Sequence, residues 1–362
     1  MTAPPSTVPL SASHAPDAHF LGDPHEIPDT AYPASADPPE QLRFLLHYAV
    51  LAPSVLNTQP WRFAVERNLI RVYADRTRQL RRVDPDGREM TMSCGAALLN
   101  LRVAALHFHL GAEVYPFPVA GQPNLLAALA LHGAAQPTDE DERLFRAIPV
   151  RRTNRHPFAE GDIPKDVIER LEQAAREEGV RLVVLTEAEA KEGVARLVEA
   201  GIRLQGEDPR AVAELGAWLR PKGDPRPDGV CDEDQGVWDR QAEVRPPAST
   251  IAVSKRELVA SSSAVLTLTT EGDTPADWLA AGQALERVLL TAAARDLQAS
   301  YVNQPVEEAT LREKLMALVG NGFPQVVFRI GFPVRHEGTP RRHVQDVLFE
   351  DVEPSSYAWR TV

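Results

Sequence analysis

The sequence contains little cysteine and no long apolar stretch. Its two cysteines, Cys94 and Cys231, are too few for a disulfide framework or a cysteine-based zinc site, and this low content fits a reducing cytoplasm. No apolar run approaches the roughly 20 residues that span a bilayer. The opening MTAPPSTVPL lacks the basic start and apolar centre of a secretory signal. We therefore expect a cytoplasmic protein that does not use a membrane.

Positive charge is scarce as well. Lys and Arg number 39 against 51 Asp and Glu, so the net charge is -12, which argues against generic binding of nucleic acid. GxGxxG and HExxH are absent, so we expect no dedicated Rossmann domain and no metal site. Ser54 has no recognisable His and Asp partners for hydrolase chemistry. Basic residues that do cluster in so acidic a chain are therefore candidate anion ligands.

The first part of the chain combines a tail with regular structure. Residues 1–39 are rich in Pro, Ala, Ser, Asp and His without a period, which predicts a mobile or surface-draped tail. A helix begins near Pro39, with Leu42, Leu45 and Leu46 at helical spacing. The stretch WRFAVERNLIRVYAD alternates as a β-hairpin does. MSCGAALLNLRVAALHFHLGAEV predicts a long helix rich in small residues.

The second part begins at the segment RRTNRHPF. A helix from Pro164 to about Glu178 precedes the strand RLVVLT, and EAEAKEGVARLVEAGIRLQ and PRAVAELGAWL have helical patterns. KGDPRPDGVCDEDQG is too rich in Pro, Gly and Asp for regular structure. AVLTLTT, DWLAAGQALERVLLTAAARDL and QVVFRIGFP then predict a strand, a long helix and a strand.

The two long helices are related by an internal repeat. A shift of 187 positions carries Gly95 onto Gly282 and Leu98 onto Leu285. Glycine and alanine at these positions let two helix axes approach closely, since little side chain separates them. The match predicts two similar halves whose long helices pack together. Chance similarity between two amphipathic helices is the alternative that the sequence leaves open.

A short polar loop follows the first helix. The segment Ala52–Phe63 reads APSVLNTQPWRF, in which a proline ends the helix and Ser54, Asn57 and Gln59 supply short polar groups. Such a loop can offer donors to the face or edge of a planar ring. Taken alone, it equally fits a capped turn with a core tryptophan.

A dense group of arginines opens the second half. The segment Arg151–Phe158 reads RRTNRHPF, with three arginines and a threonine within five residues. Guanidinium forks match phosphate oxygens, and a hydroxyl adds a donor. A solvated basic turn is the alternative. The acidic chain around the cluster favours a phosphate site.

Two further segments carry less specific signals. Asn303–Ala309 reads NQPVEEA and follows the second long helix, where an ordinary helix-to-strand turn is the alternative. Gly338–Val344 reads GTPRRHV and places two arginines near the end of the chain, where such pairs are common.

Together the four segments resemble the nitroreductase family of flavoproteins. In that family the first loop, from one subunit, touches the flavin of the other, and the arginine-threonine opening holds the FMN phosphate and ribityl chain. The third loop turns a backbone N–H to the flavin N5, which tunes the redox reaction, and the terminal basic pair closes on the phosphate. The FMN ligands that this resemblance implies are Pro53, Ser54, Val55, Asn57, Arg151, Arg152, Thr153, Arg155, Gln304, Pro305, Val306, Glu307, Glu308, Arg341 and Arg342.

The order of the motifs over residues 40–349 is similar to that of the Acg-like branch. Only the first half, 40–150, keeps the APS loop, and only the second, 151–349, keeps the arginine opening and the terminal arginines. The resemblance thus implies an α+β fold of two related halves, each with an antiparallel-rich sheet flanked by helices, fused as a pseudo-dimer with one FMN. The resemblance leaves open whether such chains associate further with one another. Residues 206–248 are the candidate lid, and 350–362 form a C-terminal tail.

The implied activity belongs to the flavin, so we expect no protein nucleophile. The expected function is an FMN-dependent oxidoreductase that passes a hydride from transiently bound NAD(P)H to a nitroaromatic, a quinone or a similar small-molecule acceptor. The alternative is a lidded FMN-binding protein that stores or sequesters flavin. A third reading takes the flavin itself as the substrate. The order and length of 206–248 discriminate between the first two.

Overall fold

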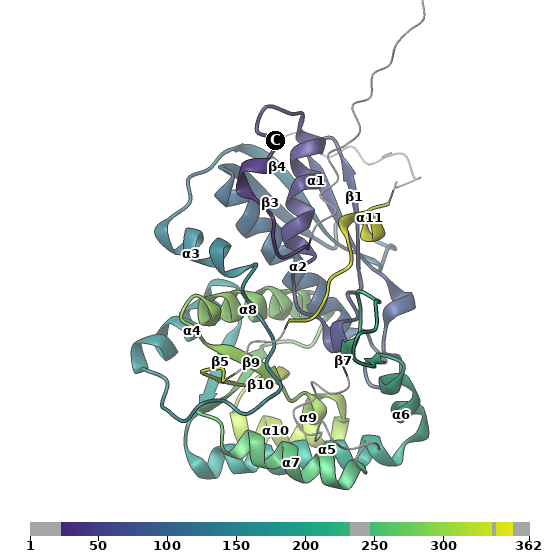
Figure 1. The fold of residues 1–362 in the computed structure, drawn as a ribbon, viewed down its shortest axis with the longest axis vertical. Helices are drawn as coiled ribbons and strands as arrows, with labels where there is room; N and C mark the ends of the chain where they lie inside the picture. The colour runs from purple at the N-terminus through teal and green to yellow at the C-terminus, as the bar shows by residue number, and fades with distance from the viewer. Residues whose placement is uncertain (1–22, 232–246, 335–337, 350–362) are drawn as a thin grey trace, which may run out of the picture.

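The computed structural model describes residues 23–231, 247–334 and 338–349 (Figure 1). Two four-stranded sheets are present in these residues, one in each part of the chain. The helices α2 (Arg88–His107) and α8 (Pro275–Ala293) pack against each other between the sheets. The expected α+β fold, with antiparallel sheets flanked by helices, is confirmed.

The first sheet has the order β1-β2-β4-β3, and each neighbouring pair is antiparallel. The predicted hairpin is present, with Glu66 opposite Leu69 and Arg67 at a φ of 53° in its turn. Asp37 accepts a hydrogen bond from the Glu40 N–H and so caps the first helix. The elements of this half are α1 (Pro38–Ala49), β1 (Trp61–Glu66), β2 (Leu69–Ala74), α2, β3 (Leu110–Pro116), β4 (Leu125–Ala134) and α3 (Asp139–Ala147).

The second sheet has the order β5-β8-β10-β9, again antiparallel throughout. Alternate residues of its strands face opposite ways, and both faces are buried. Leu266 and Phe328 pack in the core with α4 and α8, whereas Val265 and Val327 pack in the core with α5 and α10. The elements of this half are α4 (Lys165–Glu177), β5 (Arg181–Leu185), α5 (Ala188–Glu207), α7 (Ala248–Ala260), β8 (Ala264–Thr270), α8, β9 (Gln298–Tyr301), α9 (Gln304–Glu307), α10 (Ala309–Val319) and β10 (Phe323–Gly331).

The two halves share the order of their sheet strands. β5, β8, β10 and β9 take the places of β1, β2, β4 and β3, and in each half the long helix lies between the second and the third of these strands along the chain. The second half has additional helices, α5, α6 and α7 between β5 and β8 and α9 and α10 between β9 and β10. The long helices meet at Gly95 and Gly282. A Cβ on Gly282 would lie 2.1 Å from the Met92 carbonyl oxygen, and a Cβ on Gly95 would lie 2.4 Å from that of Leu279. The contact is reciprocal, because the shift of 187 that relates the glycines also relates Met92 to Leu279.

Part of the segment expected to be irregular is ordered. Within 206–248, the helix α6 (Pro209–Gly216) follows α5 directly, and β6 (Leu219–Arg220) pairs in parallel with β7 (Val230–Cys231). Asp208 accepts from the Arg210 N–H and caps α6. The helix predicted for PRAVAELGAWL is confirmed by α6. The prediction of irregular structure for KGDPRPDGVCDEDQG was wrong at Val230 and Cys231, because these residues pair with Leu219 and Arg220. Residues 232–246 of this segment, and the expected tail 350–362, lie outside the described residues.

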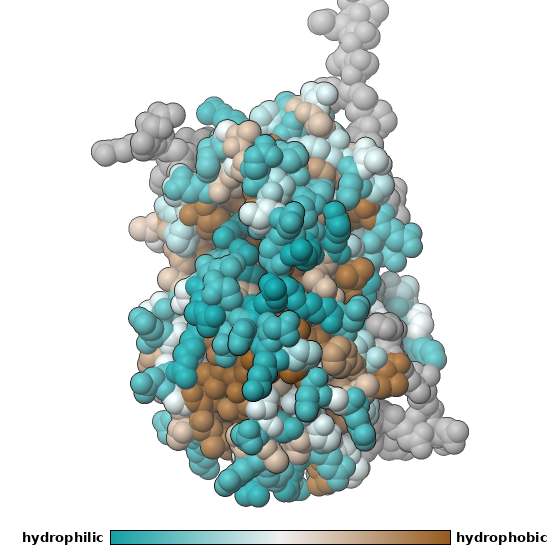
Figure 2. Space-filling view, turned by 90° about the vertical axis from the view of Figure 1, so that its left-hand side faces the viewer, coloured by the Kyte–Doolittle hydropathy of each residue, from teal (hydrophilic) through white to brown (hydrophobic). Residues whose placement is uncertain are grey.

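Residues 23–37 lie against the first half. The Tyr32 ring stacks on Phe108 at 4.0 Å between centroids, and the Tyr48 hydroxyl donates to Asp29. The surface in Figure 2 is mainly hydrophilic, as expected for a chain in which 25% of residues are charged. No helix among the described residues is long and apolar enough to cross a bilayer.

Candidate functional site

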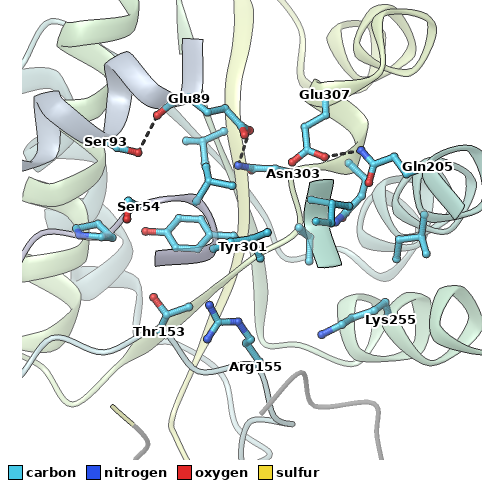
Figure 3. A pocket seen from close by; sticks show the side chains of 18 of the residues that line it. Ser54, Glu89, Ser93, Thr153, Arg155, Gln205, Lys255, Tyr301, Asn303 and Glu307 are labelled. Carbon is cyan, nitrogen blue, oxygen red and sulfur yellow. Dashed lines mark hydrogen bonds between the residues drawn. The ribbon is translucent and has the colours of Figure 1, made fainter. Parts of the chain in front are cut away.

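A cavity of about 420 Å³ lies between the two halves (Figure 3). Most of its wall is apolar, and a limited set of polar side chains points into it, as in sites for planar ligands. The apolar wall contains Pro53, Val55, Leu56, Met92, Ala96, Ile202, Val212, Leu215, Leu219, Ile251, Leu285 and Val326. The polar side chains are Ser54, Glu89, Ser93, Thr153, Arg155, Gln205, Lys255, Tyr301, Asn303, Gln304 and Glu307.

The APS loop supplies one wall of this cavity through Pro53–Leu56. The chain turns sharply after it, because Leu56, Asn57 and Gln59 all have positive φ angles. The Ser54 hydroxyl oxygen accepts from the Gln59 N–H at 2.8 Å and fixes the turn. Asn57 points away from the cavity wall and donates to the carbonyl oxygens of Gly229 and Pro340 at 3.1 and 3.0 Å.

The side chains of the arginine segment 151–155 lie partly at the cavity and partly in the protein interior. Thr153 and Arg155 line the cavity. Arg151 is buried, donates to the Leu51 carbonyl oxygen at 3.0 Å, and places its Nε 3.5 Å from a Glu286 carboxyl oxygen. Arg152 donates to the carbonyl oxygens of Pro149 and Arg151.

A positively charged cluster therefore lies behind Tyr301. Arg341 is buried there, and burial together with Arg151 and Arg152 lowers its pKa to about 9. The Nε atoms of Arg151 and Arg341 and the Tyr301 hydroxyl are buried without a hydrogen-bond partner in the described structure. Donors left unpaired in this way are costly unless a ligand engages them.

The third motif forms the opposite end of the cavity. Gln304 and Glu307 line it, whereas Pro305 and Val306 are buried beneath and Glu308 precedes α10. The Val306 carbonyl oxygen accepts from Arg88 at 2.9 Å.

Two carboxyl groups share this end. Asn303 accepts from the Val327 N–H at 3.0 Å, which orients its amide so that the NH₂ donates to Glu89 at 2.9 Å. Gln205 donates to Glu307 at 2.5 Å. Burial and the charge of Glu307 raise the pKa of Glu89 well above its usual value, and burial raises the pKa of Glu307 to about 7. This end can therefore hold a proton at neutral pH.

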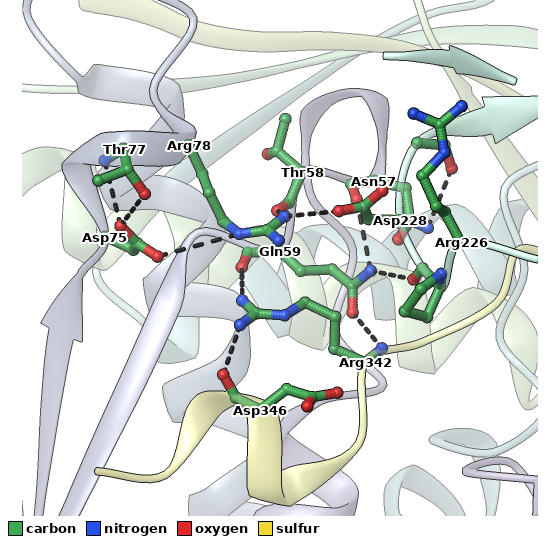
Figure 4. A network of polar contacts seen from close by, with 12 residues as sticks. Asn57, Thr58, Gln59, Asp75, Thr77, Arg78, Arg226, Asp228, Arg342 and Asp346 are labelled. Atoms are coloured by element: carbon green, nitrogen blue, oxygen red, sulfur yellow. Dashed lines mark hydrogen bonds and ion pairs between the residues drawn. The ribbon is translucent and has the colours of Figure 1, made fainter.

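The terminal arginines bind other parts of the chain outside the cavity wall, and Figure 4 shows the contacts of Arg342. The Arg342 N–H donates to the Gln59 side chain at 2.8 Å, and its guanidinium donates to the Gln59 and Asp346 carbonyl oxygens. Arg341 donates to Asn57 at 3.2 Å. These bonds fix the segment 338–347, including α11 (Val344–Val347), against the APS loop.

The same loop also anchors residues 221–229. Gln59 donates to the Pro227 carbonyl oxygen at 2.7 Å, and Asp228 accepts from Arg78 at 3.0 Å and from Arg220 at 2.8 Å. We call these contacts, with those of Asn57 and Arg342, the clasp. The clasp lies just after α6 in the chain, and Val212 and Leu215 of α6 line one side of the cavity. Glu214 of α6 accepts hydrogen bonds from the Arg82 and Val83 N–H groups of the first half.

Some site residues have no local signal in the sequence. Three helices and one strand whose sequences carry no recognisable binding motif contribute side chains to the cavity wall. These side chains are Glu89, Gln205, Lys255 and Tyr301. Burial and the neighbouring charges of Arg329 and Arg155 lower the pKa of Lys255 to about 7.

The N-terminal segment reaches the arginine cluster as well. His25 pairs with Asp23 at 3.0 Å, and burial together with Arg152 and Arg341 lowers its pKa to about 4.

Comparisons with known proteins agree on one family. A model described as the Nitroreductase family matches residues 148–332. "Putative NAD(P)H nitroreductase Rv3131" of Mycobacterium tuberculosis is 32% identical, over 85% of this chain and 91% of that protein. "Putative NAD(P)H nitroreductase acg" of the same organism is 30% identical, over 85% and 95%. A nitroreductase structure from Desulfovibrio desulfuricans in complex with FMN is 16% identical, with a TM-score of 0.34 over 58% of this chain and 98% of that one.

Proposed function

This chain belongs to the nitroreductase family, and from that membership we propose that it binds one FMN in the cavity between its halves. We infer that it is an oxidoreductase that takes electrons from NAD(P)H and passes them to a small-molecule acceptor such as a nitroaromatic or a quinone. The observation that carries the FMN proposal is an apolar cavity lined by Thr153, Arg155 and Tyr301, behind which the Nε atoms of Arg151 and Arg341 are buried without a hydrogen-bond partner in the described structure.

The polar groups present fit FMN in chemistry and in number. Arg151, Arg341 and Thr153 would hold the phosphate, because two guanidinium groups with unsatisfied N–H donors and a hydroxyl suit a dianion. Arg155 and Tyr301 would bind polar atoms nearer to the ring. The apolar wall would enclose the ring system. When bound, FMN supplies the hydride chemistry.

The remaining predicted ligands take supporting roles in this proposal. Asn57 and Arg342 belong to the clasp, and Arg152 braces the backbone of the arginine opening. Pro305, Val306 and Glu308 shape the α9 loop, whose backbone donors would face the ring edge.

We propose that the halves form a pseudo-dimer within one chain. Two features support it, namely the shared strand order and the reciprocal Gly95–Gly282 contact of α2 with α8. A symmetric dimer places the same pair of contacts on both sides of its axis. Here the APS loop comes from the first half and Thr153 and Arg155 from the second, so one chain supplies one complete site.

The side chains themselves would bind, orient and exclude water. Arg155 supplies positive charge, and the nearby Lys255, whose pKa of about 7 lets it gain or lose a proton near neutral pH, adds a donor, so this end suits electron-rich oxygens of a ligand. Glu89 and Glu307 form an end that holds a proton, with Asn303 and Gln205 fixing their orientation. Val212, Leu215 and Leu219 keep one side of the cavity dry.

A second candidate function is storage or sequestration of flavin. The observation that favours it is that Val212, Leu215 and Leu219 line the cavity, while the clasp fixes residues 221–229, which follow them, to the first half. A hydride donor would need this cover to open before it could stack on the ring.

An anaerobic NADPH titration of the purified protein, followed at the flavin absorption band, separates these functions. Bleaching by NADPH is the result expected for the oxidoreductase. A persistent band that dithionite still bleaches would favour the storage protein. The flavin-to-chain ratio of the same sample should be one. A ratio of two, or no flavin after loading with FMN, would contradict the proposed site.

A further inference from the structure

Glu286 is a buried carboxyl group beneath the arginine cluster, and the proposed mechanism does not use it. It lies within α8, on the side that meets α2, and is 0% exposed. Its closest charged neighbour is Arg151, 3.5 Å from Nε to Oε1. Neither carboxyl oxygen has a hydrogen-bond partner in the described structure. A buried carboxylate with one distant ion pair and no hydrogen bonds is poorly stabilised.

The groups that face Glu286 come from four parts of the chain. Arg151 and Arg341 approach from the segment before α4 and from the C-terminal segment, Asn100 from α2, and Tyr301 from β9. Burial raises the pKa of Glu286 to about 7, against the charges of Arg151 and Arg341. Burial also raises the pKa of Tyr301, so this hydroxyl keeps its proton at neutral pH.

A phosphate group at this cluster would compete with Glu286. Both are negative, and both would use Arg151. The Nε of Arg151 lies 3.5 Å from a Glu286 carboxyl oxygen and has no hydrogen-bond partner in the described structure. A dianion beside a buried carboxylate makes the charged form of that carboxylate less stable. Protonation of Glu286 removes the repulsion and leaves the guanidinium to the phosphate.

We propose that Glu286 is the internal counter-ion of the phosphate site, and that a phosphate dianion enters the site together with one proton, which Glu286 takes up. The proposal rests on FMN binding as proposed above. Glu286 thereby has a positioning role. Its carboxylate pairs with Arg151 in the protein without ligand, and it loses its negative charge by protonation when the phosphate binds.

The expected pH dependence has a definite sign. Below about pH 7 Glu286 is already neutral, and binding requires no proton. Above that pH the free protein carries the carboxylate, so each pH unit lowers FMN affinity by up to about tenfold, until the pH reaches the higher pKa of the bound form. The phosphate itself has its second pKa near 6 and is a dianion throughout this range.

The test is the dissociation constant of FMN from the full-length, flavin-depleted protein between pH 7 and 9, measured by flavin fluorescence. Riboflavin, which lacks the phosphate, is the matched ligand. Calorimetry at pH 8 in two buffers of different ionisation enthalpy gives the number of protons taken up. Glu307 and Lys255 in the cavity wall also titrate near pH 7 and affect both ligands. We therefore expect the ratio of FMN affinity to riboflavin affinity to fall at least tenfold across the range, and proton uptake with FMN to exceed that with riboflavin by nearly one.

Two variants assign the proton. Glu286→Gln keeps the shape and removes the titration of this group. Its ratio of FMN to riboflavin affinity should be level from pH 7 to 9, and proton uptake should be equal with both ligands. His25→Gln should retain the wild-type fall in this ratio, although His25 also faces Arg152 and Arg341. A fall in the ratio that survives in Glu286→Gln would overturn the proposal. So would a level ratio, or equal proton uptake with both ligands, in the wild-type protein, which requires no variant to fold.

The same measurements separate the role of Glu286 from the proposed binding of FMN. FMN binding with a level ratio of the two affinities contradicts the role of Glu286 alone. Failure to bind FMN at every pH contradicts the proposed function and removes this inference with it.

Discussion

The arginines of the predicted phosphate site differ in what they bind. Arg155 lines the cavity, Arg151 and Arg341 lie behind it with unsatisfied Nε atoms, and Arg152 and Arg342 donate to backbone carbonyl oxygens. Residues that match a motif equally well thus have separate tasks. Their variants should separate as well.

Arg155→Ala should weaken FMN retention by about 10- to 100-fold, since a hydrogen bond to a charged group contributes about 1.5–3 kcal/mol. The measurement is the FMN dissociation constant together with the flavin content after gel filtration. Arg143→Ala is the matched control, because Arg143 lies on the exposed face of α3 and pairs with Glu140. Normal flavin retention in Arg155→Ala would contradict its assignment.

Asp273 should stabilise the fold in a pH-dependent way. Burial alone would raise its pKa, but hydrogen bonds from Arg312, Gln325 and Trp278 outweigh it and lower the pKa to about 2. A lowered pKa in the folded state means that the stability is present above the unfolded value of about 3.8 and is lost as the pH falls toward 2.

The corresponding variant is Asp273→Asn. After allowance for solvent screening, it should lower the free energy of unfolding by about 1 kcal/mol at pH 6, with a smaller difference from wild type below pH 4. Urea denaturation at pH 6, 4 and 3 measures this. Glu169→Gln, on the exposed face of α4, is the surface control. A difference that stays constant down to pH 3 would show that the carboxylate charge is not the cause.

At the scale of elements, the crossing of α2 and α8 decides how the halves meet. Side chains at Gly95 and Gly282 would collide with backbone, which does not yield as a flexible side chain does. The cavity lies beside this crossing, because Met92 and Ala96 on α2 and Leu285 on α8 all line it. The separation of the helices therefore sets the width of the site.

Gly282→Ala should lower the free energy of unfolding by about 1–3 kcal/mol or more, because overpacking forces the backbone to move. Thermal and urea unfolding of the purified protein measure it. The control is Gly216→Ala at the end of α6, where an added Cβ meets no atom within 4 Å. Equal stability of Gly282→Ala and wild type would mean that the helices can separate without cost.

At the scale of the whole molecule, the clasp connects three distant parts of the chain. It joins the APS loop, residues 221–229 and the C-terminal segment through side-chain bonds to backbone oxygens and through the Arg342 N–H, which donates to the Gln59 side chain. It thereby ties the cover of the cavity to the first half. We expect that movement of this cover away from the cavity breaks these bonds.

Asp228→Ala should speed the exchange of bound FMN by about tenfold, because Arg78 and Arg220 both lose their shared acceptor. Displacement by excess labelled flavin measures the rate. Asp224→Ala is the control, since Asp224 accepts hydrogen bonds from Arg226 within the same loop. An unchanged rate in Asp228→Ala would show that the clasp does not limit access.

The sequence by itself determined the local structure and the family. Periodicity located the long helices and the β-hairpin, because both depend on patterns that recur within a few residues. The repeat also indicated that two glycines meet. The motif types predicted an anion site and a loop beside a planar ring, with a solvated basic turn and a capped turn as the alternatives.

Only the tertiary structure decided which of those residues face the cavity. Asn57 and Gly229 are 172 positions apart, and Arg341 reaches Asn57 from 284 positions away. Glu89, Lys255 and Glu286 lie on helices with no local signal, and burial together with distant neighbours gives their carboxyl and amino groups unusual pKa values. The physical reason is that desolvation and charge pairing depend on proximity in space, which no short stretch of sequence encodes.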